Sequence, residues 1–151
     1  MGGDDPRACL TMAVGLLARR DHSIKALKSK LRSRAFDEAV IDDTLERLQR
    51  EGLVCDERFV EAYVRSRAAR GFGPLRLRQE LLEHDMDEAL ITRHLAQLDW
   101  QMLAVNAWRK RFKGMVPDNA GERAKQIRFL QYRGFDMEQI RRLMNHDEWD
   151  D

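Results

Sequence analysis

Few residues of this 151-residue chain have the types and spacing that catalysis or metal binding requires. The four histidines form no H-x3-H pair and have no cysteine at ligand spacing, which argues against a zinc site. Cys9 and Cys55 are far apart and form no CxxC motif, so we expect buried or half-buried free thiols. Cys55 precedes Asp56, whose negative charge disfavours the thiolate that a nucleophile needs.

Phosphate binding and acid–base chemistry are equally poorly supported. The stretch Gly71-Phe72-Gly73-Pro74 is too short for a phosphate loop, and Pro74 removes a backbone N–H that would have to hold the phosphate. Acidic pairs such as Asp42-Asp43 fall in an acidic segment, and we interpret them as solvated surface. We therefore predict that the protein is not an enzyme and uses no metal or cofactor.

The composition favours helices. Hydrophobic residues make up 43% of the chain and charged residues 35%, while there are only three prolines and few β-branched residues. No apolar run approaches the ~20 residues that a membrane span needs. The N-terminus lacks the charge and the apolar segment of a signal peptide, so we expect a cytoplasmic protein.

A pattern of five positions occurs three times along the chain. Its copies run over residues 31–45, 81–95 and 130–144, so the offsets are 50 and then 49. In each copy a leucine is followed by an apolar–Asp pair, an isoleucine and a leucine or methionine. The four-residue spacing of the last two predicts one face of a buried helix. A fixed period of this length is typical of a helical repeat protein.

Each copy predicts a helix, a tight turn and a second helix. The aspartates are placed to cap the second helix, because a carboxylate accepts the free N–H groups there and favours the positive dipole end. Gly134 suits a left-handed residue at the end of the first helix, whereas Asp85 adopts that conformation at some cost and Ala35 poorly. We therefore expect the first turn to be built differently. The capping aspartates are Asp37, Asp87 and Asp136.

One more amphipathic segment precedes each helix pair, over residues 8–20, 57–70 and 99–113. The offsets superpose six expected inward positions: Cys9, Phe59, Trp108, Ala13, Tyr63 and Phe112. The predicted fold is all-α, with three tandem three-helix repeats that form an elongated, curved helical solenoid. The expected repeats are residues 1–54, 55–98 and 99–151. Residues 114–121 form the best candidate hinge, within the third repeat.

Charge is sorted along the repeat although the net charge is only +1. Residues 19–34, 58–78 and 109–133 hold 21 of the 27 lysines and arginines, and the segments between them hold most of the acids. The first two helices of each repeat are therefore basic and the third is acidic. A basic stripe of this kind is expected where a protein meets phosphates or an acidic protein groove.

Helix dipoles explain part of this sorting, because cations late in a helix and acids early in it are stabilising. They do not explain cations that occur early in their helices, where a positive charge is unfavourable. We interpret these cations as part of a partner-binding face. The alternative is that the sorted charges only compensate helix dipoles and keep the protein soluble. The early cations are Lys25, Arg76, Arg78, Arg123 and Lys125.

The sequence resembles the RecX family over essentially its whole length. The resemblance is carried by residues 52–63, which read GLVCDERFVEAY, then by Arg67, by Gly71-Phe72-Gly73-Pro74 and by Arg78-Gln79-Glu80-Leu81. It extends to residues 20–31 and 126–135. One departure is Asp85, where the family commonly has glycine.

This resemblance implies a bacterial regulator of RecA built from tandem three-helix repeats. RecX proteins bind within the groove of the RecA–single-stranded DNA filament and block its growth or promote its disassembly. They thereby inhibit strand exchange, coprotease function and ATP hydrolysis. Two alternatives stay open: a stand-alone DNA-binding helical module that contacts single- or double-stranded DNA weakly, and a scaffold for another partner. We expect a monomer without membrane contact.

The family assigns no catalytic residues, so the candidate contacts come from the basic face. Asp56, Phe59, Tyr63, Gly71 and Gly73 belong to the family pattern, but we interpret them first as cap, core and turn residues. Two arginines of the 57–70 helix should point away from its core and are the strongest candidates. These two arginines are Arg67 and Arg70. The full set of candidate contacts is Lys25, Lys28, Arg32, Arg65, Arg67, Arg70, Arg76, Arg78, Arg123, Lys125 and Arg128.

Overall fold

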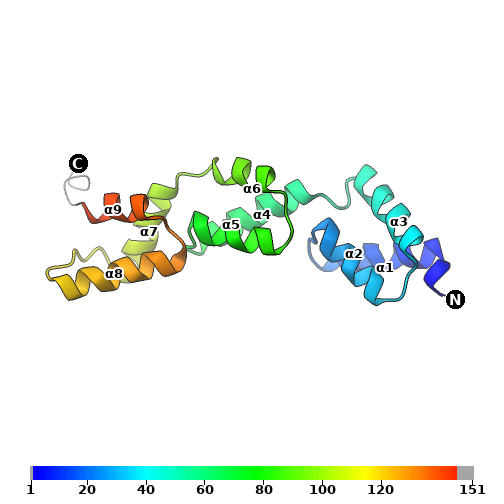
Figure 1. Cartoon of the computed structure of the whole chain (residues 1–151), viewed down its shortest axis with the longest axis horizontal. Helices are drawn as coiled ribbons and strands as arrows, with labels where there is room; N and C mark the ends of the chain where they lie inside the picture. The colour runs from blue at the N-terminus through cyan, green and yellow to red at the C-terminus, as the bar shows by residue number, and fades with distance from the viewer. Residues whose placement is uncertain (1, 146–151) are drawn as a thin grey trace. The chain divides into compact units, whose positions relative to one another are not determined.

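The computed structural model describes residues 2–145, and within this range the chain is helical without any strand. Figure 1 shows the helices in chain order. After a short 3-10 helix, η1 (Gly2–Asp4), the α-helices are α1 (Pro6–Arg19), α2 (Ile24–Ser33), α3 (Glu38–Arg50), α4 (Asp56–Ala69), α5 (Pro74–Glu83), α6 (Glu88–Leu95), α7 (Trp100–Phe112), α8 (Ala120–Arg133) and α9 (Met137–Met144). None of these helices has the length and apolar character that crossing a membrane requires.

The predicted all-α fold of three-helix repeats is confirmed. Each repeated pattern forms the second and third helices of a set, and the amphipathic segment in front of it forms the first helix. The sets are α1–α3, α4–α6 and α7–α9. Two compact units divide the chain: the first holds residues up to Glu61 together with His84–Met86, and the second holds Ala62–Glu83 and the described residues from Asp87 onward.

The capping aspartates occupy the N-cap position as predicted, but not all of them use the side chain. Asp87 accepts a hydrogen bond from the amide of Leu90, and Asp136 forms a complete capping box with Gln139. Asp37 makes no side-chain cap, and its own amide donates to the carbonyl of Gly3 over 2.8 Å. The N-terminal segment therefore supports the turn before α3.

The turn between the second and third helices has the same backbone form in all three repeats. Ala35, Asp85 and Gly134 all have positive φ, at 66°, 59° and 99°. The expectation that the first turn is built differently was wrong. Alanine in this region costs roughly 1–2 kcal/mol, and the packing of the two helices that the turn joins outweighs this cost.

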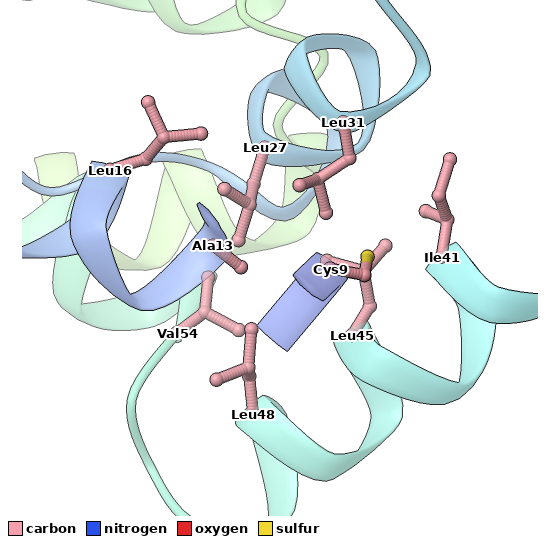
Figure 2. Close-up of a cluster of buried hydrophobic side chains, with 9 residues drawn as sticks. All are labelled: Cys9, Ala13, Leu16, Leu27, Leu31, Ile41, Leu45, Leu48 and Val54. Atoms are coloured by element: carbon pink, nitrogen blue, oxygen red, sulfur yellow. The ribbon is translucent and has the colours of Figure 1, made fainter. Parts of the chain in front are cut away.

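The first compact unit has a core to which all three helices of the first repeat contribute. Figure 2 shows these side chains directed toward a common centre. Cys9 and Ala13 come from α1, and both are fully buried, as predicted. Leucines and an isoleucine at helical spacing complete the core from α2 and α3, and Val54 closes it after α3. The predicted stripe of α3, Ile41, Leu45 and Leu48, lies entirely within this core.

The inward face of α4 differs by one residue from the prediction. Val60 and Val64 are buried to 0% and 2% exposure, whereas Phe59 and Tyr63 are only half-buried. Adjacent apolar residues at both registers leave the sequence pattern ambiguous here. In the structure Val60 and Val64 are the buried pair, so the inward face of α4 lies one position later than predicted. Phe59 instead packs edge-on against the ring of His84, with 5.5 Å between the ring centroids.

The third repeat has a core around Trp108 and Phe112, which are buried as predicted. The indole N–H of Trp108 donates to the amide oxygen of Gln126 over 2.7 Å, and that amide nitrogen donates to the carbonyl of Met115 over 2.9 Å. Gln126 has no exposed surface. It therefore links the core to Met115 in the connection between α7 and α8, within the predicted hinge of residues 114–121.

Candidate interaction surface

Three arginines from three helices surround the ring of Phe72, which lies between α4 and α5. The guanidinium carbon of Arg67 lies 4.0 Å from the ring centroid, that of Arg76 4.5 Å and that of Arg133 5.0 Å. Such contacts contribute about 0.5–1 kcal/mol at exposed sites and more when desolvated. We call these three arginines the Phe72 cluster. They join helices of the second and third repeats within the second compact unit.

Glu80 neutralises two members of the Phe72 cluster. Arg67 donates two hydrogen bonds to its carboxylate, at 3.2 and 2.8 Å, and Tyr63 donates a third at 3.1 Å. Arg76 lies 3.6 Å from the same carboxylate. Partial burial raises the pKa of the Glu80 carboxyl, but the hydrogen bonds and charges of these partners outweigh burial and lower that pKa below its usual value.

The expectation that Arg67 points away from the core was therefore wrong. Its side chain is 21% exposed and lies between Glu80 and Phe72. The physical reason is a partner thirteen residues away on α5, which no pattern within α4 could indicate. The side chain of Arg70 is exposed, as expected, while its carbonyl accepts a hydrogen bond from Arg133 over 3.0 Å.

The first turn of α5 is capped by the last turn of α8. The amide of Gly73 donates to the carbonyl of Arg133 over 2.7 Å, and the amide of Leu75 donates to the carbonyl of Gly134 over 2.9 Å. A helix N-terminus carries partial positive charge and a C-terminus partial negative charge, so this meeting is favourable. Arg76 adds a hydrogen bond to the carbonyl of Tyr132 over 3.2 Å.

A corresponding contact occurs in the first compact unit. Lys25, early in α2, lies 2.9 Å from the carboxylate of Asp85 in the turn after α5. Asp56 at the start of α4 accepts a hydrogen bond from the amide of Ile24 over 2.9 Å. In both units, the start of a repeat's second helix therefore contacts the following repeat: the start of α2 contacts Asp56 and Asp85, and the start of α5 contacts the turn after α8.

The other two predicted contacts of α2 are also paired with acids. Lys28 lies 3.2 Å from Asp42 and 3.8 Å from Glu38, and Arg32 is hydrogen-bonded to Glu38. The hydrogen bond from Arg32 lowers the pKa of the Glu38 carboxyl. These are exposed ion pairs, which contribute little to stability because water and salt screen them. The acidic start of α3 therefore faces the basic α2 and neutralises it locally.

The remaining predicted contacts are dispersed over the second unit. Arg78 donates to the hydroxyl of Thr92 over 3.0 Å, and Arg123 is 3.5 Å from the carbonyl of Met144. The others, Arg65, Lys125 and Arg128, have exposed side chains.

The sequence did not indicate that Arg133 contacts the ring of Phe72 and belongs to the Phe72 cluster. From the sequence, Arg133 is explained as one of the cations that occur late in a helix and complement its dipole, and it does lie in the last turn of α8. Its contact with Phe72 spans 61 positions of the chain, and no local signal reports it. A separate question is whether the structure contains a metal site. Within residues 2–145, no group of three or more His, Cys, Asp or Glu side chains is placed to hold a metal ion.

Comparisons with known proteins agree with the resemblance. Three family models match: the first three-helix domain of RecX at residues 9–48, the second at 56–95 and the third at 99–144. Regulatory protein RecX from Pseudomonas fluorescens strain SBW25 is 43% identical over 141 residues, which cover 92% of this chain and 91% of the relative.

Two further matches extend this similarity. Regulatory protein RecX from Pseudomonas savastanoi pv. phaseolicola is 41% identical over 150 residues, which cover 98% of this chain and 97% of the relative. The crystal structure of RecX from Lactobacillus salivarius superposes with a TM-score of 0.81 at 19% identity, and the match covers 93% of this chain and 95% of that one. The sequence comparisons and the fold comparison therefore both match this chain to RecX proteins.

Proposed function

Because this chain belongs to the RecX family of regulatory proteins, we propose that it is a negative modulator of RecA. It binds the groove of the RecA–single-stranded DNA filament and blocks filament growth, ATP hydrolysis, strand exchange and coprotease activity. It acts in the bacterial cytoplasm, in recombinational repair and the SOS response, without catalysing a reaction itself. The observation that carries the proposal is the 43% identity to a regulatory protein RecX over 92% of the chain.

The contact surface that we propose begins with the cations that no acid neutralises. Arg70, Lys125 and Arg128 are exposed, and no carboxylate among residues 2–145 forms an ion pair with them. Lys125 and Arg128 are three positions apart and so lie on one face of α8. These three residues can meet filament phosphates or acidic groove walls without first breaking an internal contact.

The paired cations form a second class of proposed contact. The Lys25–Asp85 pair has side chains that are 63% and 52% exposed, so its contribution to stability is small. Lys28 and Arg32 can exchange their acidic partners for a filament group at similarly low cost. Arg67 and Arg76 hold the fold together around Glu80, so we assign them an indirect role, in positioning the exposed cations nearby.

Inhibition then follows from differential affinity. A ligand shifts a conformational equilibrium only as far as it binds one state better than another. We propose that the protein binds one conformation of the filament groove preferentially, which disfavours the conformations that filament growth and ATP hydrolysis require.

The decisive measurement is ATP hydrolysis by RecA on single-stranded DNA, with and without substoichiometric amounts of this protein. Strong inhibition is expected, and unchanged hydrolysis would contradict the proposal. Binding to naked DNA with a steep dependence on salt, in the absence of an effect on RecA, would instead favour the stand-alone DNA-binding module.

A further inference from the structure

The second compact unit contains a basic pocket, of whose lining only Arg70 is among the exposed cations proposed above to meet the filament. It lies between the end of α4, the middle of α7 and the end of α8, and its volume is about 470 Å³, within the usual range for a ligand pocket. Four cations line it, and no aspartate or glutamate does. These cations are Arg70, Lys110, Arg111 and Arg133.

Two of the cations are held in place by neighbouring groups that do not neutralise them. Arg133 donates to the carbonyl of Arg70, and its guanidinium lies 5.0 Å from the centroid of the Phe129 ring. The guanidinium of Arg111 lies 5.9 Å from the centroid of the same ring and 5.2 Å from that of Phe112. Hydrogen bonds to a carbonyl and contacts with rings orient these charges without cancelling them.

The pocket therefore concentrates positive charge. None of its four cations forms an ion pair with a carboxylate in residues 2–145. Like charges at one site repel each other and raise the local electrostatic potential. An anion that enters the pocket relieves this repulsion, and the planar guanidinium groups suit carboxylates and phosphates equally well.

The rest of the lining decides between these two kinds of anion. Leu103, Ala68 and Ala107 give the pocket an apolar floor, and Asn106 is its one uncharged polar side chain. Sites for single-stranded nucleic acid usually combine a basic groove with several aromatic side chains on which successive bases stack. Phe129 is the one aromatic residue of the lining, and two guanidinium groups together with the edge-on ring of Phe112 already pack around it.

We infer that this pocket binds an acidic peptide segment of a protein partner, in which one aliphatic side chain is flanked by carboxylates. The aliphatic group enters the apolar floor, and the carboxylates meet the cations at the rim. Gly71 also lines the pocket, and a Cβ there would contact Nη1 of Arg133 at 3.3 Å and Cβ of Ala107 at 3.7 Å. This inference does not depend on the proposed action on RecA.

Lys110 and its neighbour Arg109 provide a matched pair of variants. Both are exposed and lie on α7, but only Lys110 lines the pocket. The probe is a fluorescein-labelled peptide of sequence DELDED, titrated with the intact protein by fluorescence anisotropy. Lys110→Glu should weaken binding about tenfold or more, which corresponds to about 1.4 kcal/mol, whereas Arg109→Glu should change it less than about twofold, because its side chain lies outside the pocket.

Two further probes test the chemistry of the ligand. A peptide in which serine replaces the leucine should bind several-fold more weakly, because the apolar floor loses its partner. Oligothymidylate tests the nucleic-acid alternative. The inference is overturned if DELDED does not bind at millimolar concentration, if the two charge reversals weaken it equally, or if Lys110→Glu impairs oligothymidylate binding more than peptide binding. The assay contains no RecA, so its failure and that of the ATP hydrolysis test are distinguishable.

Discussion

Gly73 and Gly134 meet backbone to backbone, and a Cβ on Gly73 would lie 2.5 Å from the carbonyl carbon of Gly134. A Cβ on Gly134 would in turn collide with Arg76. Gly73 does not require glycine for its φ, because Gly71 and Gly134 have positive values, at 90° and 99°, and Gly73 does not. Its requirement is steric: the backbone amides at the start of α5 can donate to the carbonyls of Arg133 and Gly134 only while no side chain separates the two segments.

Gly73→Ala should therefore destabilise the protein by about 1–3 kcal/mol, the usual cost of forcing atoms into a packed site. Urea unfolding followed by circular dichroism measures this change. Gly15→Ala is the control, because Gly15 lies in α1 and a Cβ there meets nothing within 4 Å. That variant should stabilise by about 0.5–1 kcal/mol. Equal effects of the two substitutions would contradict the close contact.

Ala35→Gly should stabilise the protein by about 0.5–1 kcal/mol, because Ala35 has a φ of 66° and glycine adopts this conformation without the Cβ penalty. Ala39→Gly, four residues later in α3, is the control and should destabilise by up to about 1 kcal/mol. Thermal unfolding of both variants beside the wild type gives the comparison. A loss of stability in Ala35→Gly would show that the turn does not have the conformation described.

Gln126→Leu should destabilise by about 1–3 kcal/mol, because the buried indole N–H of Trp108 loses its acceptor. Urea unfolding monitored by tryptophan fluorescence measures the loss. Gln131→Leu, at an exposed position of the same helix, should stay within about 0.5 kcal/mol of the wild type. If the two substitutions cost the same, the buried hydrogen bond contributes nothing specific.

Stability should fall as the pH drops below the ordinary His22 pKa of 6.5. Burial lowers the pKa of the His22 imidazole, and the nearby positive charge of Lys30 lowers it further. The unfolded chain then binds its proton at a higher pH than the folded chain, so protonation favours unfolding between the two values. His22→Asn should show a smaller loss of stability between pH 7.5 and 5.5. An identical loss in both proteins would exclude His22 as a source of the dependence.

Charge reversal on α8 should separate filament contact from folding. Lys125→Glu combined with Arg128→Glu should weaken inhibition of RecA ATP hydrolysis severalfold while leaving helicity unchanged, because both side chains are exposed and unpaired within residues 2–145. Arg50→Glu, an equally exposed position on the acidic α3, should retain inhibition. Arg67→Glu is unsuitable for this purpose, because it places two carboxylates together at Glu80. Undiminished inhibition by the α8 double variant would refute the proposed surface.

The repeat could be predicted from sequence because its determinants are local. An aspartate at an N-cap and apolar residues four positions apart act within one or two helical turns, and Ile91 and Leu95 are buried as that spacing requires. In α4 the same reasoning selected Phe59 and Tyr63 over Val60 and Val64. Both registers are apolar there, so the spacing of apolar residues alone cannot tell which pair is buried.

The candidate site was less predictable, because its contacts join residues far apart in the chain. From the sequence, Arg67 is a plausible exposed cation. In the structure it forms a hydrogen bond with Glu80 on the next helix, which neutralises its charge. Arg133 and Phe72 meet only when the ends of α4 and α8 lie together. Composition could locate the basic segments, but the tertiary packing determines which of their charges are neutralised.

The capping of α5 by α8 has a consequence for synthesis on the ribosome. The carbonyl acceptors of the Gly73 and Leu75 amides belong to Arg133 and Gly134, and at 5–20 residues per second they are made about 3–12 s later. During that interval the first turn of α5 is a nascent helix end with only water as acceptor. We expect the second repeat to reach its final stability only after the third has been translated.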